Sequence, residues 1–252
     1  MLEEIIGPLR LRFPGALENE FREDYYHKSL NSLRLSILLG AVLFGLFGVL
    51  DYWIFPEALK AAWIIRYGIA CPAILACLLF TYSRSFKRYM QPVVSATVVF
   101  AGACIIALMV MVGSPINYVH SAGLLLVLMY TFTFSKLRFG YTSIASWVIV
   151  LLYELAAIGI MNTPFSALLN DNYLFFSANV IGMFSHYHRD RYMRRDFMHN
   201  RMTRELEEKR HILEREKILR DLNDGLGGIP TNVGLVAQIG QVIRNGLALL
   251  GV

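Results

Sequence analysis

Charged residues are scarce in this sequence. Only 17% of its 252 residues are Asp, Glu, Lys or Arg, whereas 56% are hydrophobic and the mean hydropathy is +0.47. Water-soluble domains usually carry about a quarter charged residues. The composition therefore excludes an ordinary soluble domain and favours a membrane protein. The long apolar runs end at Tyr187 and a densely charged segment follows from Arg189 to Arg220, which predicts the main domain boundary near residue 188.

Cysteine is rare, and no metal-ligand pattern is present. Cys71, Cys77 and Cys104 lie inside apolar runs and show neither Cys-x-x-Cys nor Cys/His zinc spacing, so we expect small core residues. His186 and His188 are two residues apart, which turns them to different sides of a helix. The sequence therefore predicts no metal and no cofactor.

Long apolar runs fill the chain between Leu33 and Tyr187. A helix needs roughly 20 mainly apolar residues to cross the hydrocarbon layer, and turn formers separate the runs. The sequence predicts an all-α polytopic membrane protein, with six transmembrane helices followed by a long cytoplasmic coiled-coil helix. The predicted spans are Leu33–Ile54, Ala61–Tyr82, Pro92–Val112, Tyr118–Phe134, Phe139–Met161 and Asn172–Tyr187, with a loop from Asn162 to Asp171 before the last.

The distribution of basic residues predicts the orientation. Lys and Arg gather before the first span, in every second connection and after the last span, whereas the other connections carry only Lys60. By the positive-inside rule, both termini are expected in the cytoplasm of a bacterial inner (cell) membrane protein. The same bias accounts for the net charge of +5, so we expect no nucleic acid as a partner.

The first 30 residues are expected to form a cytoplasmic amphipathic segment. Leu17, Phe21 and Tyr25 recur every fourth residue among charged residues, which gives one apolar stripe on a polar helix. Three interpretations fit the stripe. It lies along the inner membrane surface, packs on the cytoplasmic rod, or is a solvated lead-in to the first span.

A charged rod is expected after the last span. From Arg189 to Arg220 there is neither Pro nor Gly, which predicts a helix that continues from the sixth span. An isolated helix this polar is marginal in water, so we expect a parallel homodimer, with a rigid spacer as the alternative. Two apolar registers meet near Leu213: Met198, Met202 and Leu206 form the first, and Ile212, Leu219, Leu226 and Val233, with Leu222, Ile229 and Val236 between them, form the second.

The segment after the rod carries a recognisable motif. Arg220-Asp221-Leu222-Asn223-Asp224-Gly225-Leu226-Gly227-Gly228 resembles the phosphoacceptor box of sensor histidine kinases of the NarX/DesK-like subfamily, which reads Arg-Asp-Leu-His-Asp-Gly-Leu-Gly-Gly. The resemblance implies a helix that dimerises within a four-helix bundle. It also implies that Asp224 matches the acidic residue that helps deprotonate the acceptor histidine, and that the intact kinase has a response regulator as its partner.

Asn223 stands where that subfamily has histidine. An amide has no basic ring nitrogen to attack phosphorus or carry a phosphoryl group, so autophosphorylation at this residue is excluded. The sequence also lacks an ATP-binding domain and a phosphate-binding Gly-x-x-x-x-Gly-Lys-[Ser/Thr] loop. The chain itself is expected not to be an enzyme. We expect either an N-terminal fragment of a protein histidine kinase with its acceptor replaced, or a natural degenerate product.

The apolar region carries a second, looser resemblance. Phe21-Arg22-x-x-Tyr25, Ser29-Leu30, Leu33-Arg34 and Leu46-Phe47-Gly48-x-x-Asp51 are similar to the six-span anchors of bacterial class III adenylyl cyclases. This implies an interchangeable receptor module. The expected domains are an N-terminal segment at 1–30, a transmembrane sensor domain at 31–188, a signalling helix at 189–220, and a truncated dimerisation and phosphoacceptor-like helix at 221–252.

Ionisable residues inside spans are costly and usually have a partner or a function. Four of them share a similar depth in the outer half of the predicted spans, with three tyrosines beside them. We interpret the set as a polar-capped pocket for a small amphipathic or lipid-like ligand with an ionised head group. The alternative is snorkelling and structural pairing, such as Asp51 with Arg66. The candidate ligand-binding residues are Asp51, Arg66, His120, Glu154, Tyr67, Tyr118 and Tyr153.

Together these features predict a dimeric, membrane-embedded sensory module. A ligand or lipid signal would pass through the sixth span and the coiled coil to a kinase. The alternative is a small transporter or channel with a coiled-coil dimerisation tail. The spans show no visible inverted repeat, which speaks against a transporter.

Overall fold

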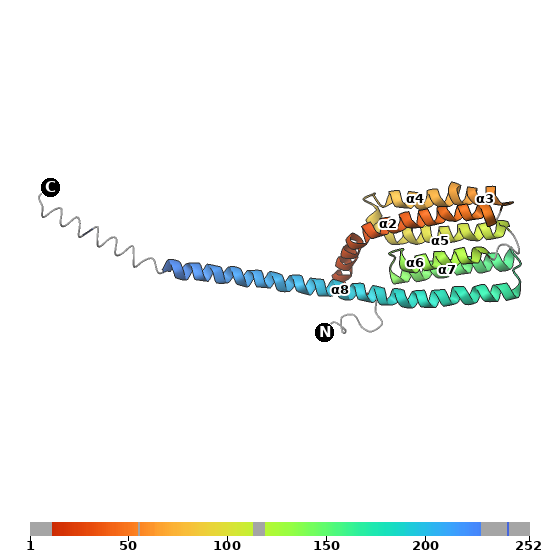
Figure 1. The fold of residues 1–252 in the computed structure, drawn as a ribbon. Helices are drawn as coiled ribbons and strands as arrows, with labels where there is room; N and C mark the ends of the chain where they lie inside the picture. Colours follow the sequence, from red (N-terminus) through yellow and green to blue (C-terminus); the bar gives the residue numbers. More distant parts are fainter. Residues whose placement is uncertain (1–11, 55, 113–118, 228–240, 242–252) are drawn as a thin grey trace, which may run out of the picture. The chain divides into compact units, whose positions relative to one another are not determined.

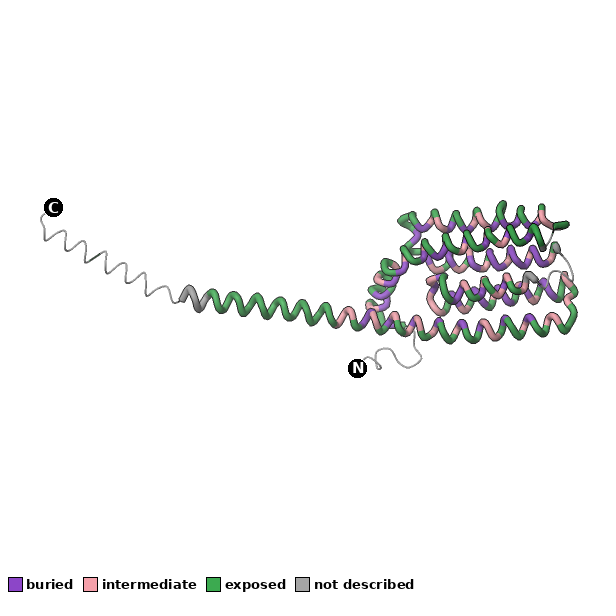
Figure 2. The backbone as a smooth tube through the Cα atoms, in the orientation of Figure 1, coloured by how far each residue is buried: buried purple, intermediate pink, exposed green. Residues whose placement is uncertain are grey.

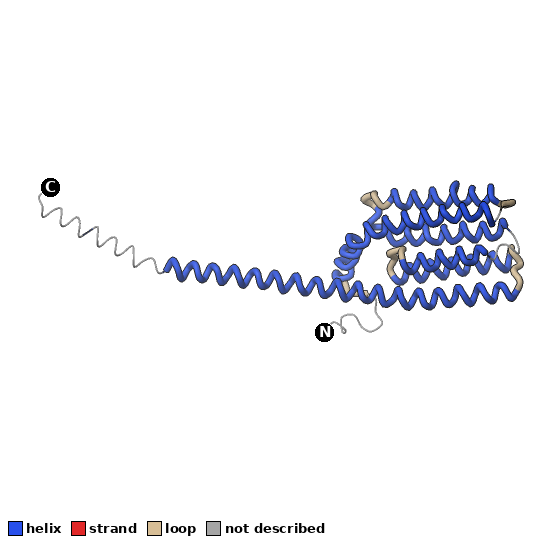
Figure 3. Tube along the Cα trace, in the orientation of Figure 1, coloured by secondary structure: helices blue, strands red, loops and turns tan. Residues whose placement is uncertain are grey.

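The computed structural model describes residues 12–54, 56–112, 119–227 and 241. Across these residues the regular secondary structure is helical and no strand is present, as Figure 3 shows. The chain divides into two compact units, Met1–Arg195 and Asp196–Val252. An all-α fold, as predicted, is therefore confirmed for the described residues.

The first unit is a bundle of helices lying side by side (Figure 1). Helix α5 packs against α4, α6 and α7, whereas α2 packs against α3, η1 and α4. The elements are α2 (Ala16–Ile54), α3 (Leu59–Trp63), the π-helix η1 (Ile64–Ala70), α4 (Cys71–Phe80), α5 (Phe86–Val112), α6 (Val119–Thr133), α7 (Phe139–Gly159) and the first part of α8 (Phe165–Gly227).

Four of these helices are long and apolar enough to cross a membrane. They are Ala16–Trp53, Leu59–Phe80, Phe86–Met111 and Phe139–Gly159, and they overlap the first, second, third and fifth predicted spans. The segment Ser121–Thr133, in the fourth predicted span, is a shorter apolar helix. The sixth predicted span lies in α8, where Asp171, Asn172 and Asn179 lower the apolar character.

Many large apolar residues of the bundle are exposed. Figure 2 marks the exposed positions along each helix in green. Leu79 on α4, Ile144 on α7 and Ile181 on α8 are among the most exposed of them. Apolar surface this extensive marks contact with a membrane or a partner rather than with water. These helices therefore belong to a membrane protein.

The structure differs from the sequence pattern near two prolines: one predicted span begins inside a longer helix, and part of one predicted loop is helical. Helix α5 begins at Phe86, so Pro92 lies inside it rather than at its start. Helix α8 begins at Phe165, so Asp171 is helical rather than part of a loop. The carbonyl oxygen of Pro164 accepts the amide hydrogen of Leu168 at 3.0 Å. Proline is suited to this position because its fixed φ already matches the start of a helix.

A π-helical turn interrupts the second candidate membrane-spanning helix, Leu59–Phe80. Pro72 has no amide hydrogen and its ring clashes with the carbonyl group four residues before it in a regular α-helix. The chain widens to the π-helix η1 over Ile64–Ala70, directly before this proline. Such widened turns are frequent at functional sites, and this one carries the buried Arg66.

The described part of the second unit, apart from residue 241, is the continuation of α8 to Gly227. The absence of Pro and Gly between Arg189 and Arg220 predicted such a helix. Its predicted seam residues Leu206, Ile212 and Leu219 are exposed, and pairs such as Arg201 with Glu205, at 3.1 Å, run along its surface. The side chains of Leu226, Ile229, Val233 and Val236 lie outside the described residues.

Candidate functional site

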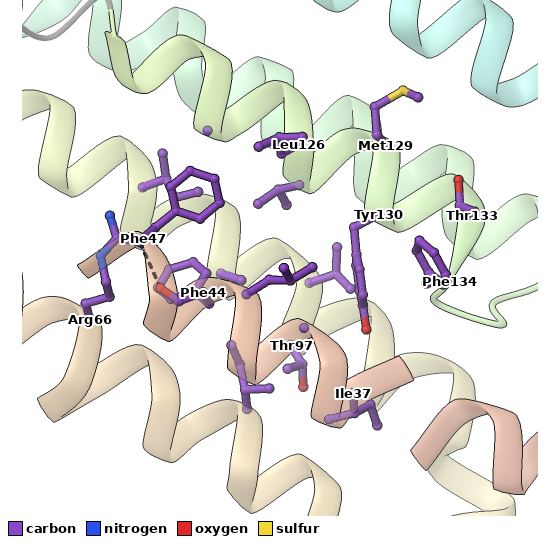
Figure 4. A pocket seen from close by; sticks show the side chains of 18 of the residues that line it. Ile37, Phe44, Phe47, Arg66, Thr97, Leu126, Met129, Tyr130, Thr133 and Phe134 are labelled. Atoms are coloured by element: carbon purple, nitrogen blue, oxygen red, sulfur yellow. Dashed lines mark hydrogen bonds between the residues drawn. The ribbon is translucent and has the colours of Figure 1, made fainter. Parts of the chain in front are cut away.

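An apolar cavity of about 600 Å³ lies between five elements of the first unit (Figure 4). Its walls come from α2 between Ile37 and Asp51, from η1 and α4, from α5 between Val94 and Ile105, and from α6 with Phe134 behind it. The volume is within the range of ligand pockets, about 300–1,000 Å³. We call this space the lateral cavity.

Asp51 and Arg66 form the polar wall of the lateral cavity. Arg66 donates Nε to Oδ2 of Asp51 at 2.8 Å and Nη2 to Oδ1 at 3.1 Å, while its Nη1 donates to the carbonyl oxygen of Phe44 at 3.2 Å. Both side chains are buried. A bidentate pair of this kind is strong and well oriented. The structural pairing weighed in the sequence analysis is therefore present.

Tyr130 bridges α6 and α2 at the other end of the cavity. Its hydroxyl donates to the carbonyl oxygen of Ser36 at 2.9 Å, and its ring lies against Gly40, where an added Cβ would come within 3.2 Å. Figure 4 shows Tyr130 and Phe134 at this end and Arg66 at the opposite one. Gly40 thus permits the close approach that closes this end.

Of the other predicted ligand-binding residues, Tyr67, Tyr153 and Glu154 do not line the lateral cavity. Tyr67 is partly exposed and donates its hydroxyl to the carbonyl oxygen of Gly45 at 2.7 Å. Tyr153 is buried and donates to Oδ2 of Asp171 on α8 at 2.6 Å. Oε1 of Glu154 is buried and has no hydrogen-bond partner among the described residues.

Two further predicted residues fall on parts whose side chains are not described. Tyr118 lies outside the described residues, and of His120 only the backbone, in α6, is described. The structure thus brings Asp51 and Arg66 together at the cavity and Tyr153 together with Asp171 at the α7–α8 contact. The ligand-binding role of the whole set stays a prediction.

A buried ion cluster, which sequence reasoning missed, joins the beginning of α2 to α8. Glu18 accepts Nη1 of Arg194 at 2.9 Å, Nη2 of Arg138 at 2.6 Å and the amide hydrogen of Phe13 at 2.9 Å. Arg194 is fully buried and stacks over the rings of Phe13 and Phe21. We call Glu18, Arg138 and Arg194 the Glu18 cluster.

The apolar stripe of the N-terminal segment packs inside the first unit. Phe21 is buried under Arg194, and Tyr25 donates its hydroxyl to the carbonyl oxygen of Lys136 at 2.9 Å. Packing on α8 was one of the three interpretations, and the solvated lead-in is excluded because both rings are buried. Glu18 falls on the same helical face as Phe21 and Tyr25, at spacings i+3 and i+7, a signal that could have identified it.

His186 and Arg189 attach α8 to the end of α6. The ring nitrogens of His186 lie 3.1 Å from the carbonyl oxygen of Phe132 and 2.9 Å from that of Leu137. Arg189 donates to the carbonyl oxygens of Phe132 and Thr133, which satisfies acceptors left open at a helix end. Burial, followed by the charge of Arg189, lowers the pKa of Lys136 in the connection beside them.

Two further features are the possibility of a metal site and the phosphoacceptor-like segment. The described residues contain no group of three or more His, Cys, Asp or Glu that could hold a metal ion. The backbone of Asn223 and Asp224 lies in α8, while their side chains are outside what the structure describes. Their chemistry rests on the residue types alone.

Comparison with known protein families identifies the family of this chain. A family model, MASE8, matches residues 49–204, more than half of the sequence. The chain belongs to the MASE8 family. MASE8 is a membrane-associated sensory domain, so this chain carries a membrane sensory module. The match includes Asp51, Arg66 and Arg194 but begins after Glu18. No curated protein matches the chain.

Proposed function

We propose that this MASE8 chain is the dimeric input module of a two-component sensor histidine kinase. It relays a ligand or lipid signal through α8 to the kinase, and the chain itself is catalytically incompetent because Asn223 replaces the acceptor histidine. The observation that carries the proposal is the continuity of α8. One helix, Phe165–Gly227, contains residues buried in the bundle, such as Phe175, and the motif that resembles a phosphoacceptor box.

The Glu18 cluster and His186 supply the coupling in this proposal. They attach α8 to α2, to the α6–α7 connection and to the end of α6. Packed interfaces switch between discrete arrangements rather than deforming continuously. A shift of the bundle helices would therefore be passed to α8 as a change between such arrangements.

The membrane topology in this proposal has six crossings and both termini in the cytoplasm. Helix α6 and the first part of α8 lie alongside the four longer helices (Figure 1), and Ile181 and Phe184 of α8 are exposed apolar residues. Arg138, Arg189 and Arg194 are linked to one end of the bundle through Glu18 and Thr133. Clustered basic residues favour the cytoplasmic side.

A parallel homodimer through α8 completes the proposal. Leu206, Ile212, Leu219 and Leu222 are exposed within the described part of the second unit. Helices with such a seam bury it against a partner helix. Membrane lipids surround the bundle, and the intact kinase would pass its phosphoryl group to a response regulator.

A chimera tests this function. Residues 1–222 are joined in register to the acceptor helix and ATP-binding domain of a NarX/DesK-like kinase, which restores histidine at position 223. Autophosphorylation is then measured in phosphatidylcholine vesicles of short and long acyl chains. We expect roughly a fivefold or larger difference between the two membranes, the lower range of allosteric coupling.

The matched control for the chimera begins at residue 196 and lacks the bundle. Its autophosphorylation is expected to be the same in both membranes, because it retains only the rod. Equal activity of the complete chimera in both membranes, at the level of this control, would contradict the proposed function.

A further inference from the structure

We propose that the lateral cavity holds a single acyl chain of a bilayer phospholipid, which enters sideways between α2 and α6. The head group stays outside, at the membrane surface. This inference rests on the proposed sensory function, because it names the acyl chain as the part of the membrane that the module senses. The sequence patterns assigned only Asp51 and Arg66 of this lining to a ligand pocket, and the family match assigns no site.

The opening of the cavity faces the region where lipid would lie. Leu43 and Leu50 on α2 and Leu126 and Met129 on α6 line the cavity, yet each is about half exposed, between 41% and 51%. They therefore form its rim. The floor is made by smaller or buried residues of α5, such as Ala101 and Val98. A gap with an exposed apolar rim and a buried apolar floor admits hydrocarbon from the side.

The length of the cavity fits a hydrocarbon chain better than a helix of a second copy. From Ile37 to Asp51 the cavity follows α2 for about 21 Å, at 1.5 Å per residue. The contact of Tyr130 with Gly40 closes one end of this length, and Arg66, paired with Asp51, lies at the opposite end. A membrane-spanning helix of about 20 residues is roughly 30 Å long and would extend past both ends, whereas an acyl chain needs to enter with one end only.

Apart from the exposed Thr133, the hydrogen-bonding side chains of the wall already have partners. Asp51 and Arg66 bind each other, Tyr130 donates to Ser36, and Thr97 donates to the carbonyl oxygen of Val93 at 2.9 Å. The part of the ligand inside the cavity therefore needs no charge and no hydrogen-bonding group. A void between close-packed helices forfeits van der Waals contacts along its walls unless apolar atoms fill it, and acyl chains are the apolar molecules that surround this bundle.

Photolabelling of the full 252-residue chain tests the site. The protein is reconstituted in dioleoylphosphatidylcholine vesicles that contain a phosphatidylcholine with a diazirine in one acyl chain, and labelled peptides are identified by mass spectrometry. We expect labels concentrated on cavity-lining residues of α2 and α6, such as Phe47 and Val127. Labels spread evenly over all lipid-facing helices, including Leu151 and Ile158 on α7, would overturn the proposal.

Two variants that fill the cavity sharpen the test. Ala101→Leu places a larger side chain on the floor, and Ala122→Leu does so at an exposed lining position that tolerates bulk if the first variant fails to fold. Each is expected to reduce cavity labelling by roughly tenfold or more, the penalty for a misfit of methylene size in an apolar pocket. The control Ala96→Leu, on α5 but exposed and outside the cavity, is expected to leave labelling unchanged.

Two other results would also count against the acyl-chain site. Unchanged labelling in both filling variants would overturn the proposal, as would cross-links between two copies of the chain at Leu126 or Met129. Labelling is scored without any kinase. A chimera whose autophosphorylation does not respond to the membrane would therefore contradict the proposed function but not the acyl-chain site. Absent labelling of the cavity would contradict the site but not the response of the chimera.

Discussion

Glu18→Gln is expected to lower the free energy of unfolding by about 3–5 kcal/mol, the usual cost of breaking a buried ion pair from one side. The substitution keeps the size of the side chain but removes its charge. Arg194, which is fully buried, then keeps only the more distant carboxylate of Asp190, 3.6 Å from its Nε. The measurement is equilibrium unfolding of the detergent-solubilised chain, followed by circular dichroism.

A control and a double variant separate this effect from a general loss of charge. Glu23→Gln alters an exposed carboxylate on the same helix, whose partner is Lys87, and is expected to leave stability unchanged. Glu18→Gln combined with Arg194→Met is expected to be more stable than Glu18→Gln alone, because the unpaired cation is gone. If Glu18→Gln and Glu23→Gln unfolded alike, the structural role of the Glu18 cluster would be wrong.

Asp51→Leu is expected to have an effect of similar size at the other end of the bundle. It leaves the guanidinium of Arg66 buried beside the apolar cavity, with only the carbonyl oxygen of Phe44 as a partner. The loss should again be about 3–5 kcal/mol, since a charge inside a membrane span is costly without its counter-ion. The same unfolding measurement applies.

Replacing Arg66 together with Asp51 is expected to restore the free energy of unfolding. In Asp51→Leu combined with Arg66→Met no charge is left buried, so stability should return to within about 1 kcal/mol of the original chain or exceed it. Glu57→Leu, at an exposed position near the same end, serves as control and should change little. A double variant less stable than Asp51→Leu would show that the pair does not act as a unit.

The Asp51–Arg66 pair shows what the sequence can predict about this bundle. The two residues face each other across a short hairpin, 15 positions apart, so opposite charge and equal depth suffice to pair them. Similar depth did not bring Tyr67, Tyr153 or Glu154 to the same cavity. It says nothing of the direction in which a residue points around its helix, and Tyr153 turns towards α8 while Asp51 turns towards the cavity.

Long-range contacts and cavities could not be predicted from the sequence. Glu18 is 176 positions from Arg194 and 120 from Arg138, and no local pattern relates residues at such separations. The lateral cavity depends on how closely whole helices approach, which small residues such as Gly40 permit but do not specify. The Pro and Gly pattern was sufficient only for local features such as the continuous helix α8.

In the proposed function, α8 carries a change of state from the bundle to the phosphoacceptor-like segment as one continuous helix. The most direct measurement inserts one to seven alanines after Glu208 in the chimera and records autophosphorylation for each length. The account predicts output that rises and falls with helical phase, about 3.6 residues per turn, and returns close to the original at seven. Output that is the same at every length would contradict it.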